Sequence, residues 1–159
     1  MNESKIELSG FLKRINLIHK AIMSSPLIIG IVVYQVSDNP YLLVFEAWDL
    51  LMVFVISALI LGFYLSDLLF KKYVLATSPN ASLGQKLEKF QAAFLLKMVF
   101  LEMPALISAG VFVLTQNLLY LIIIVGVVVY LGFLSPTKEK IILALDLRGA
   151  EKDKINQAH

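Results

Sequence analysis

Four long hydrophobic segments, separated by short polar links, form the main pattern of this sequence. They cover residues 15–36, 47–70, 90–115 and 118–134. About 20 apolar residues in a helix cross the hydrocarbon core of a bilayer, and a helix satisfies its own backbone hydrogen bonds there. The sequence therefore predicts an all-α fold in which residues 1–134 form a four-transmembrane-helix bundle.

The third segment carries charged residues at unusual places. Glu102 lies near the middle of the predicted span, where a carboxylate costs about 2.5–3.5 kcal/mol and usually faces a bundle interior or a wet cavity. Lys97 is about 140° around the helix from Glu102, so the two are poor partners. Ala105 and Ala109 share the Glu102 stripe and form a small-xxx-small pattern, which is typical of closely packed transmembrane helices. We expect Glu102 to face another helix.

Two interpretations of Glu102 remain open from the sequence. In one, desolvation keeps the carboxyl protonated and it hydrogen-bonds a neighbouring helix. In the other, it is a proton or cation site whose proton affinity is tuned by Lys97, Lys20 or His19. A lone histidine near the entry of a span, such as His19, is more typical of a hydrogen-bonded interfacial residue than of a ligand.

Pro104 is expected to kink the third helix and to free a backbone carbonyl one turn earlier, near Phe100. Such a kink can act as a hinge beside Glu102 or can serve packing alone, and packing is the more common role of a proline in a span.

The links suggest where helices begin. Ser37 to Pro40 form a turn in which Asn39 can cap a second helix that starts at Pro40. Ser82 followed by Gln85 is a capping-box pattern, so the third helix should begin before it enters the membrane.

After the fourth segment, Ser135 and Pro136 are expected to cap and start an amphipathic interfacial helix. Its Ile141, Ile142, Leu145 and Leu147 would lie on the membrane surface. This cytoplasmic tail comprises residues 135–159, and its last ten or so residues are expected to be disordered.

A weak internal repeat relates the two halves of the chain. An offset of 78 residues aligns four pairs: Pro26 with Pro104, Ser24 with Glu102, His19 with Lys97, and Asn39 with Asn117. Two parallel helical-hairpin repeats about an axis along the membrane normal would follow, and they would place Ser24 at the depth of Glu102. Apolar sequence also aligns by chance, so the repeat stays an alternative.

Composition supports membrane insertion and excludes several chemistries. Of the 159 residues, 58% are hydrophobic and 16% charged, against about 45–50% and 25% in soluble domains. The net charge of +2 gives no reason to expect a nucleic-acid partner. With no cysteine and only two histidines, the sequence predicts no metal site and no cofactor, and it contains no recognisable nucleophile and base set. We expect a protein that is not an enzyme.

The basic residues indicate orientation. The two links at residues 37–46 and 115–117 contain no basic residue. The basic residues beside the segments lie before the first segment, in the middle link and in the tail: Lys5, Lys13, Arg14, Lys71, Lys72, Lys86, Lys89, Lys138, Lys140 and Arg148. By the positive-inside rule, both termini and the middle link are cytoplasmic. Asp67 precedes Lys71 by four residues, a spacing that favours a surface ion pair.

Two stretches carry a resemblance. Residues 102–115 read EMPALISAGVFVLT, and residues 135–147 read SPTKEKIILALDL, with a Pro-Thr-x-x-Lys motif. In these the chain resembles a group of small uncharacterised four-span bacterial inner-membrane proteins, some of which carry generic transporter labels. The resemblance implies a bacterial inner-membrane location and supplies no catalytic residue.

Two functions fit these observations. The first is a structural or accessory subunit that lies in the lipid bilayer with other membrane subunits or as a homo-oligomer. The alternative is a small proton- or cation-coupled transporter that uses Glu102, with Lys97, Lys20, His19 and Ser24 as further ion-site candidates and Pro104 as hinge. A carrier needs a wet path to Glu102, whereas a subunit needs a dry partner for it.

Overall fold

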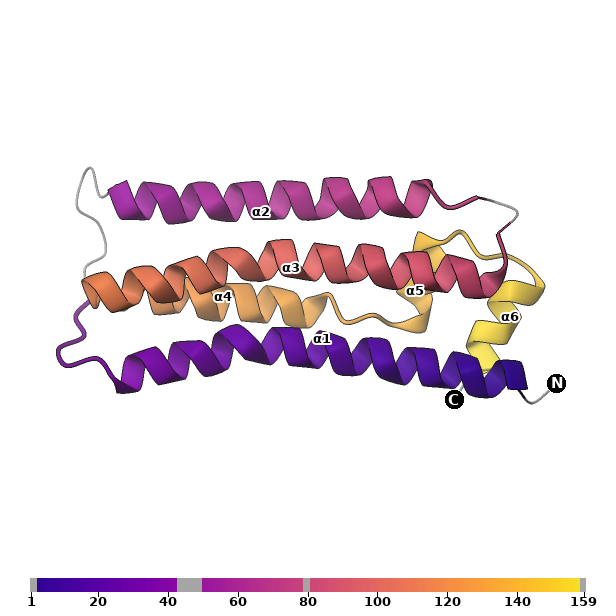
Figure 1. Ribbon diagram of the computed structural model, residues 1–159, viewed down its shortest axis with the longest axis horizontal. Coiled ribbons are helices and arrows are strands. Elements are labelled where there is room, and N and C mark those ends of the chain that lie inside the picture. The colour runs from indigo at the N-terminus through magenta and orange to yellow at the C-terminus, as the bar shows by residue number, and fades with distance from the viewer. Residues whose placement is uncertain (1–2, 43–49, 79–80, 158–159) are drawn as a thin grey trace.

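The computed structural model describes residues 3–42, 50–78 and 81–157, with the side chains of residues 3–7 left aside. Within these ranges every regular element is a helix, which confirms the all-α prediction (Figure 1). The helices are α1 Glu3–Gln35, α2 Leu50–Leu75, α3 Leu83–Thr115, α4 Leu119–Phe133, α5 Lys138–Ala144 and α6 Ala150–Gln157.

Three helices, α1, α2 and α3, are long and apolar enough to cross a membrane. With 15 residues, α4 is about 22 Å long, shorter than a hydrocarbon core of about 30 Å. After a short break α5 continues from α4 with a bend of 80°, so the pair can count as one broken span. The described chain therefore has three spans, or four with the bent pair.

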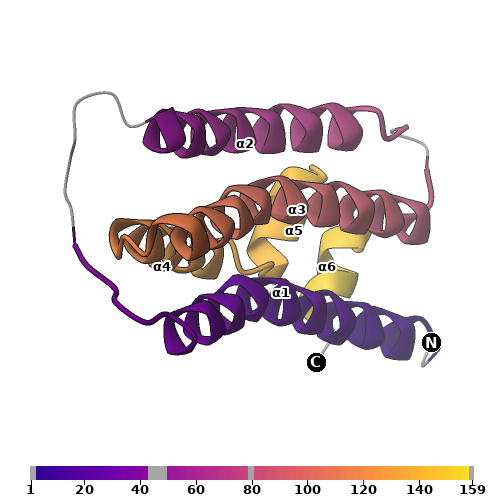
Figure 2. The ribbon, with the colours of Figure 1, turned by 60° about the vertical axis from the view of Figure 1, so that its left-hand side comes forward.

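The centre of the arrangement is α3. It lies between α1 and α2, and α4 packs against both α3 and α1 (Figures 1 and 2). The two hairpins consequently differ: α3 and α4 are packed together, whereas α1 and α2 make almost no contact with each other. Two equivalent helical-hairpin repeats, the alternative suggested by the sequence, would have packed α1 against α2 as α3 packs against α4. The packing therefore does not support that alternative.

Buried side chains form two clusters along α3. The larger one joins α1, α3, α4 and the tail, and includes Ile15, Met98, Leu101 and Leu131. The smaller one surrounds Phe112 near the opposite end. Outward positions of the long helices are mostly large and apolar, as expected of helices that lie in lipid.

One end of the bundle, here called the turn end, joins two links. Gln116 ends α3 in a left-handed conformation, and its side chain accepts a hydrogen bond from the backbone of Asn39 at 2.9 Å. Tyr41 exchanges backbone hydrogen bonds with Gln116 and Leu118, at 3.1 and 2.8 Å. The prediction of a helix starting at Pro40 is therefore wrong, because this backbone pairs with the other link instead.

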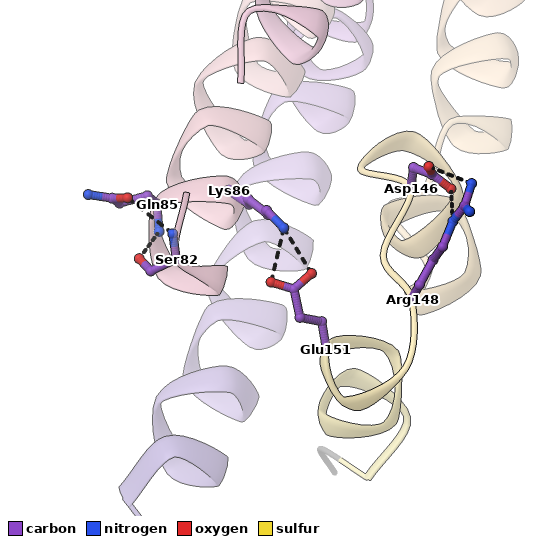
Figure 3. Close-up of polar contacts among 6 residues, drawn as sticks. All are labelled: Ser82, Gln85, Lys86, Asp146, Arg148 and Glu151. Atoms are coloured by element: carbon purple, nitrogen blue, oxygen red, sulfur yellow. Dashed lines mark hydrogen bonds and ion pairs between the residues drawn. The ribbon is translucent and has the colours of Figure 1, made fainter. Parts of the chain in front are cut away.

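The opposite end of the bundle is here called the basic end. The helix α3 starts there, with the cap that the sequence predicts. Ser82 accepts a hydrogen bond from the backbone N–H of Gln85, and the Gln85 side chain accepts one from the backbone of Ser82, so the capping box is confirmed (Figure 3). The helix starts at Leu83, seven residues or about 10 Å before Phe90, where the predicted third span begins. It therefore begins before that span, as the sequence predicted.

The structure of the tail differs from its prediction. It forms two short helices instead of one, because Asp146 and Gly149 adopt left-handed backbone conformations between them. Thr137, not Ser135, caps α5, and its hydroxyl accepts a hydrogen bond from the backbone of Lys140. Residues 150–157 are helical where disorder was expected.

The same apolar residues that were expected on the membrane surface hold the tail to the bundle. Ile141 and Leu147 are buried in the larger cluster, together with Ile155 of α6. At the surface of this contact, the ammonium of Lys86 lies 2.9 and 3.0 Å from the two carboxylate oxygens of Glu151 (Figure 3). The tail packs here because α1 and α3 extend past the predicted spans and offer it Leu8 and Leu87.

Ile155→Ala should release α6 from the bundle. Ile155 has no exposed surface, and removing such a side chain costs about 2–5 kcal/mol of local packing. Amide hydrogen exchange in residues 150–157 should accelerate at least tenfold, while exchange in α3 stays unchanged. Lys152→Ala, on the exposed side of the same helix, is the control, and equal acceleration in both variants would contradict the packing role of Ile155.

Candidate functional site

Lys97 forms an ion pair between α2 and α3. Its ammonium lies 2.5 Å from a carboxylate oxygen of Asp67 and 5.2 Å from the centre of the Phe70 ring. The expected pairing of Asp67 with Lys71 is replaced by this one, since antiparallel packing brings Asp67 across to α3. Lys97 is thus engaged on the α2 side of α3, away from Glu102.

His19 is a buried contact between α1 and α4. Its Nε2 lies 2.8 Å from the carbonyl oxygen of Leu131, and its ring lies 6.0 Å from that of Phe94. A carbonyl oxygen only accepts hydrogen bonds, so Nε2 carries the proton and donates. The hydrogen bond that the sequence favoured for His19 is therefore present, and it is directed to the backbone.

Lys140 donates hydrogen bonds to backbone carbonyls at the end of α4. Its ammonium donates to the carbonyl oxygens of Phe133 and Ser135, at 2.7 and 3.0 Å. The last carbonyls of a helix lack intrahelical donors, and α4 ends after only 15 residues. Lys140 supplies donors from α5 to the carbonyls of Phe133 and Ser135, and His19 of α1 gives the Leu131 carbonyl a second donor beside the N–H of Leu134. Sequence reasoning missed Lys140, although the shortness of the fourth segment was a signal that its last carbonyls would need partners.

Glu102 lies at the border between a buried and an exposed strip of α3. Ala105 and Ala109, which were predicted to share a stripe of the helix with Glu102, are buried, and so is Met98 one turn before it. Val99 and Met103 on the adjoining strip are exposed. Glu102 itself is half-buried. Among the residues that the structure describes, none donates a hydrogen bond to its carboxyl or forms an ion pair with it.

The register between α1 and α3 shows which residue of α1 is level with Glu102. Arg14 donates to Gln91, and the backbone of Asn39 donates to the Gln116 side chain; both bonds join residues 77 positions apart. Ser25 is therefore at the height of Glu102. Ser24, the candidate at an offset of 78, donates its hydroxyl hydrogen to the carbonyl of Ala21 in its own helix.

The remaining candidates do not gather around Glu102. Lys20 is exposed and lines an open groove between α1 and α5 at the basic end. Lys97 and His19 have the partners described above. In the described ranges, no three His, Asp or Glu side chains come close enough to hold a metal ion.

Pro104 lies inside a continuous α3 and is buried against α2. Proline has no N–H, so the carbonyl of Phe100 loses its helical donor, as predicted. Gly62 of α2 lies directly over this carbonyl: a Cβ atom there would be 2.6 Å from the Phe100 oxygen and 2.9 Å from Cγ of Pro104. Sequence reasoning missed Gly62, which permits the close approach of the two helices.

The described residues have the features of a small polytopic α-helical membrane protein: three helices, with the bent pair as a fourth if it counts as one span, are long and apolar enough to cross a membrane, and they are organised around α3. Comparisons with protein-family models, with curated proteins and with solved structures found no match to the chain.

Proposed function

We propose that this chain is a structural or accessory subunit of a larger assembly in the bacterial inner membrane, with both termini on the cytoplasmic side. The main observation in support of this proposal is the position of Glu102. It lies half-buried beside the exposed Val99 and Met103, close to the middle of the predicted span. A carboxyl at that depth is costly unless it is partnered, and a neighbouring subunit that covers this strip would supply a partner.

The engagement of the other polar side chains supports a subunit over a carrier. The groups that would tune a proton site at Glu102 are bound elsewhere, Lys97 to Asp67 and His19 to the Leu131 carbonyl. Both contacts join helices of this chain, which is what a scaffold requires.

The location rests on the distribution of charge and on the resemblance in sequence. Lys86, Lys89 and Lys140 belong to the basic end, whereas the links at the turn end contain no Lys or Arg. A cytoplasmic basic end agrees with the positive-inside rule.

The runner-up function is a proton- or cation-coupled transporter that uses Glu102. One observation favours it: the register of α1 and α3 places Ser25 at the height of Glu102, so a hydroxyl and a carboxyl are available at one depth. Hydroxyl and carboxyl oxygens are suitable partners for a proton or a hard cation.

Photocrosslinking from a single introduced cysteine tests the subunit hypothesis. The chain has no cysteine of its own, so Met103→Cys can carry a benzophenone beside Glu102 in native membranes. Met103 is 51% exposed; Val125→Cys on α4, with 52% exposure, is the matched control. We expect one discrete product of defined mass from position 103 and none from position 125. Equal, diffuse labelling from both positions would contradict the hypothesis.

Infrared spectroscopy of the carboxyl band separates the two functions. For a subunit, Glu102→Gln should leave the pH titration between about 5 and 8 unchanged and should reduce the crosslinked product, because the amide replaces a group that contacts the partner. A carboxyl band that titrates in this range, disappears in Glu102→Gln, and leaves the crosslink intact would favour the transporter.

A further inference from the structure

A small cavity opens at the basic end, between α2, α3 and α5. Its volume is about 200 Å³, and most of its wall is apolar, with Phe70, Phe90, Phe94 and Ala144 among the lining residues. The Phe90 ring stacks on Phe94 and meets Phe70 edge to face, so the aromatic wall is continuous. Pockets for drug-sized ligands span about 300–1,000 Å³, so this cavity has room for only part of a larger molecule, such as a short length of acyl chain, or for a small group.

Two ammonium groups border this apolar space. Lys97 and Lys140 both line the cavity, and none of the other described residues that line it carries a carboxylate. Asp67 compensates the charge of Lys97 from outside the wall, whereas the partners of Lys140 in the described part of the chain are backbone carbonyl oxygens. The cavity is thus apolar inside, and Lys140 gives its border one positive charge that no carboxylate of the described residues compensates.

Its place in the fold brings this cavity to the edge of the bilayer. It lies where α4 ends and α5 turns away by 80°. Leu143 of α5, which also lines it, is 83% exposed, so an apolar surface continues outward from the cavity. Basic pockets between transmembrane helices at the membrane interface are typical binding places for anionic lipid headgroups.

We propose that this cavity binds an anionic phospholipid, with the phosphate against Lys140 and the upper part of an acyl chain along the Phe70–Phe90–Phe94 wall. Charge-assisted hydrogen bonds hold the phosphate, and the apolar wall selects a lipid over a soluble phosphate. The site requires only that the chain lies in a membrane, so it does not depend on the proposed subunit role.

The larger groove on the other side of α5 is a poorer place for such a headgroup. It combines Lys13, Lys20 and Lys138 with Glu139. Hydrogen bonds from its own backbone N–H and from Thr137, with the nearby charge of Lys138, hold the pKa of Glu139 below its usual value. Glu139 is ionised at neutral pH and offsets part of the positive charge of the lysines. The described residues that line this groove also include no aromatic side chain to form a wall for an acyl chain.

Native mass spectrometry of the full chain tests the site, with phosphatidylglycerol, phosphatidylcholine and inorganic phosphate as the three probes. We expect phosphatidylglycerol to be retained at least fivefold more than phosphatidylcholine, and inorganic phosphate not to displace it. Lys140→Gln should lower the retention of phosphatidylglycerol about fivefold, the change expected for one charge near an anionic surface. Lys71→Gln, at the exposed end of α2, should leave retention unchanged.

Ala144→Phe keeps the test decisive if Lys140→Gln disturbs the end of α4. It fills the cavity without changing charge and should abolish selective retention while the helical circular dichroism is preserved. Equal retention of both lipids by the wild type would overturn the proposal. So would displacement by inorganic phosphate, an equal loss in Lys71→Gln, or full retention by Ala144→Phe.

Discussion

Gly62→Ala should loosen the contact between α2 and α3 and lower the stability of the bundle by about 1–3 kcal/mol, the usual cost of overpacking. The new methyl group would lie 2.6 Å from the carbonyl oxygen of Phe100, and that oxygen belongs to the backbone, so it cannot turn away. Alanine favours a helix over glycine by about 1 kcal/mol, so a loss of stability would mean that the steric contact outweighs helix propensity. Unfolding in mixed detergent micelles, followed by circular dichroism, measures this change.

Gly110→Ala is the matched control for this experiment. It also lies inside a long helix, but no atom outside its own backbone neighbourhood is within 4 Å of an added Cβ. We expect Gly110→Ala to be neutral or stabilising. A similar loss in both variants would show that α2 and α3 are not closely packed at Gly62.

A double-mutant cycle with Pro104→Ala identifies the atoms responsible. Pro104→Ala removes the Cγ atom 2.9 Å from the added methyl and restores an N–H donor for Phe100, which lets that carbonyl turn back into the helix. The double variant should therefore lose less stability than the sum of the single variants. Strict additivity would mean that Gly62 and Pro104 do not interact.

The parts of the fold that the sequence predicts are those that depend on local chemistry. Ser82 and Gln85 mark the start of α3 because both capping hydrogen bonds are made within four residues. The missing donor at Pro104 follows from one side chain. Pro40, by contrast, has the sequence of a helix start, yet its link pairs with backbone more than 70 residues away. Local preference cannot reveal such a contact.

The candidate site was harder to predict for the same reason. A helical wheel places Glu102, Ala105 and Ala109 on one stripe, and the alanines are indeed buried. The partners of Lys97 and His19 depend on which helices are neighbours, and that order is a property of the whole bundle. Asp67 and Leu131 are 30 and 112 residues away from them in the chain.

His19→Ala should destabilise the bundle strongly, with a loss of about 3 kcal/mol or more. His19 is 4% exposed, and its ring fills space between α1, α3 and α4. The variant loses one of two hydrogen bonds to the Leu131 carbonyl, which costs about 0.5–1.5 kcal/mol. The larger part of the loss comes from the cavity that the ring leaves. Hydrogen exchange should show the effect first at the end of α4, because the Leu131 carbonyl keeps only the N–H of Leu134.

Two further substitutions separate the hydrogen bond from the volume. His19→Phe retains a ring but cannot donate to Leu131, whereas His19→Gln retains a donor in a smaller side chain. If the donor matters most, the glutamine variant should be the more stable of the two and should protect the end of α4 better. Lys20→Ala, exposed beside it, should be neutral. If the phenylalanine variant is as stable as wild type, the end of α4 does not need its side-chain donor, and packing alone explains why a histidine is buried there.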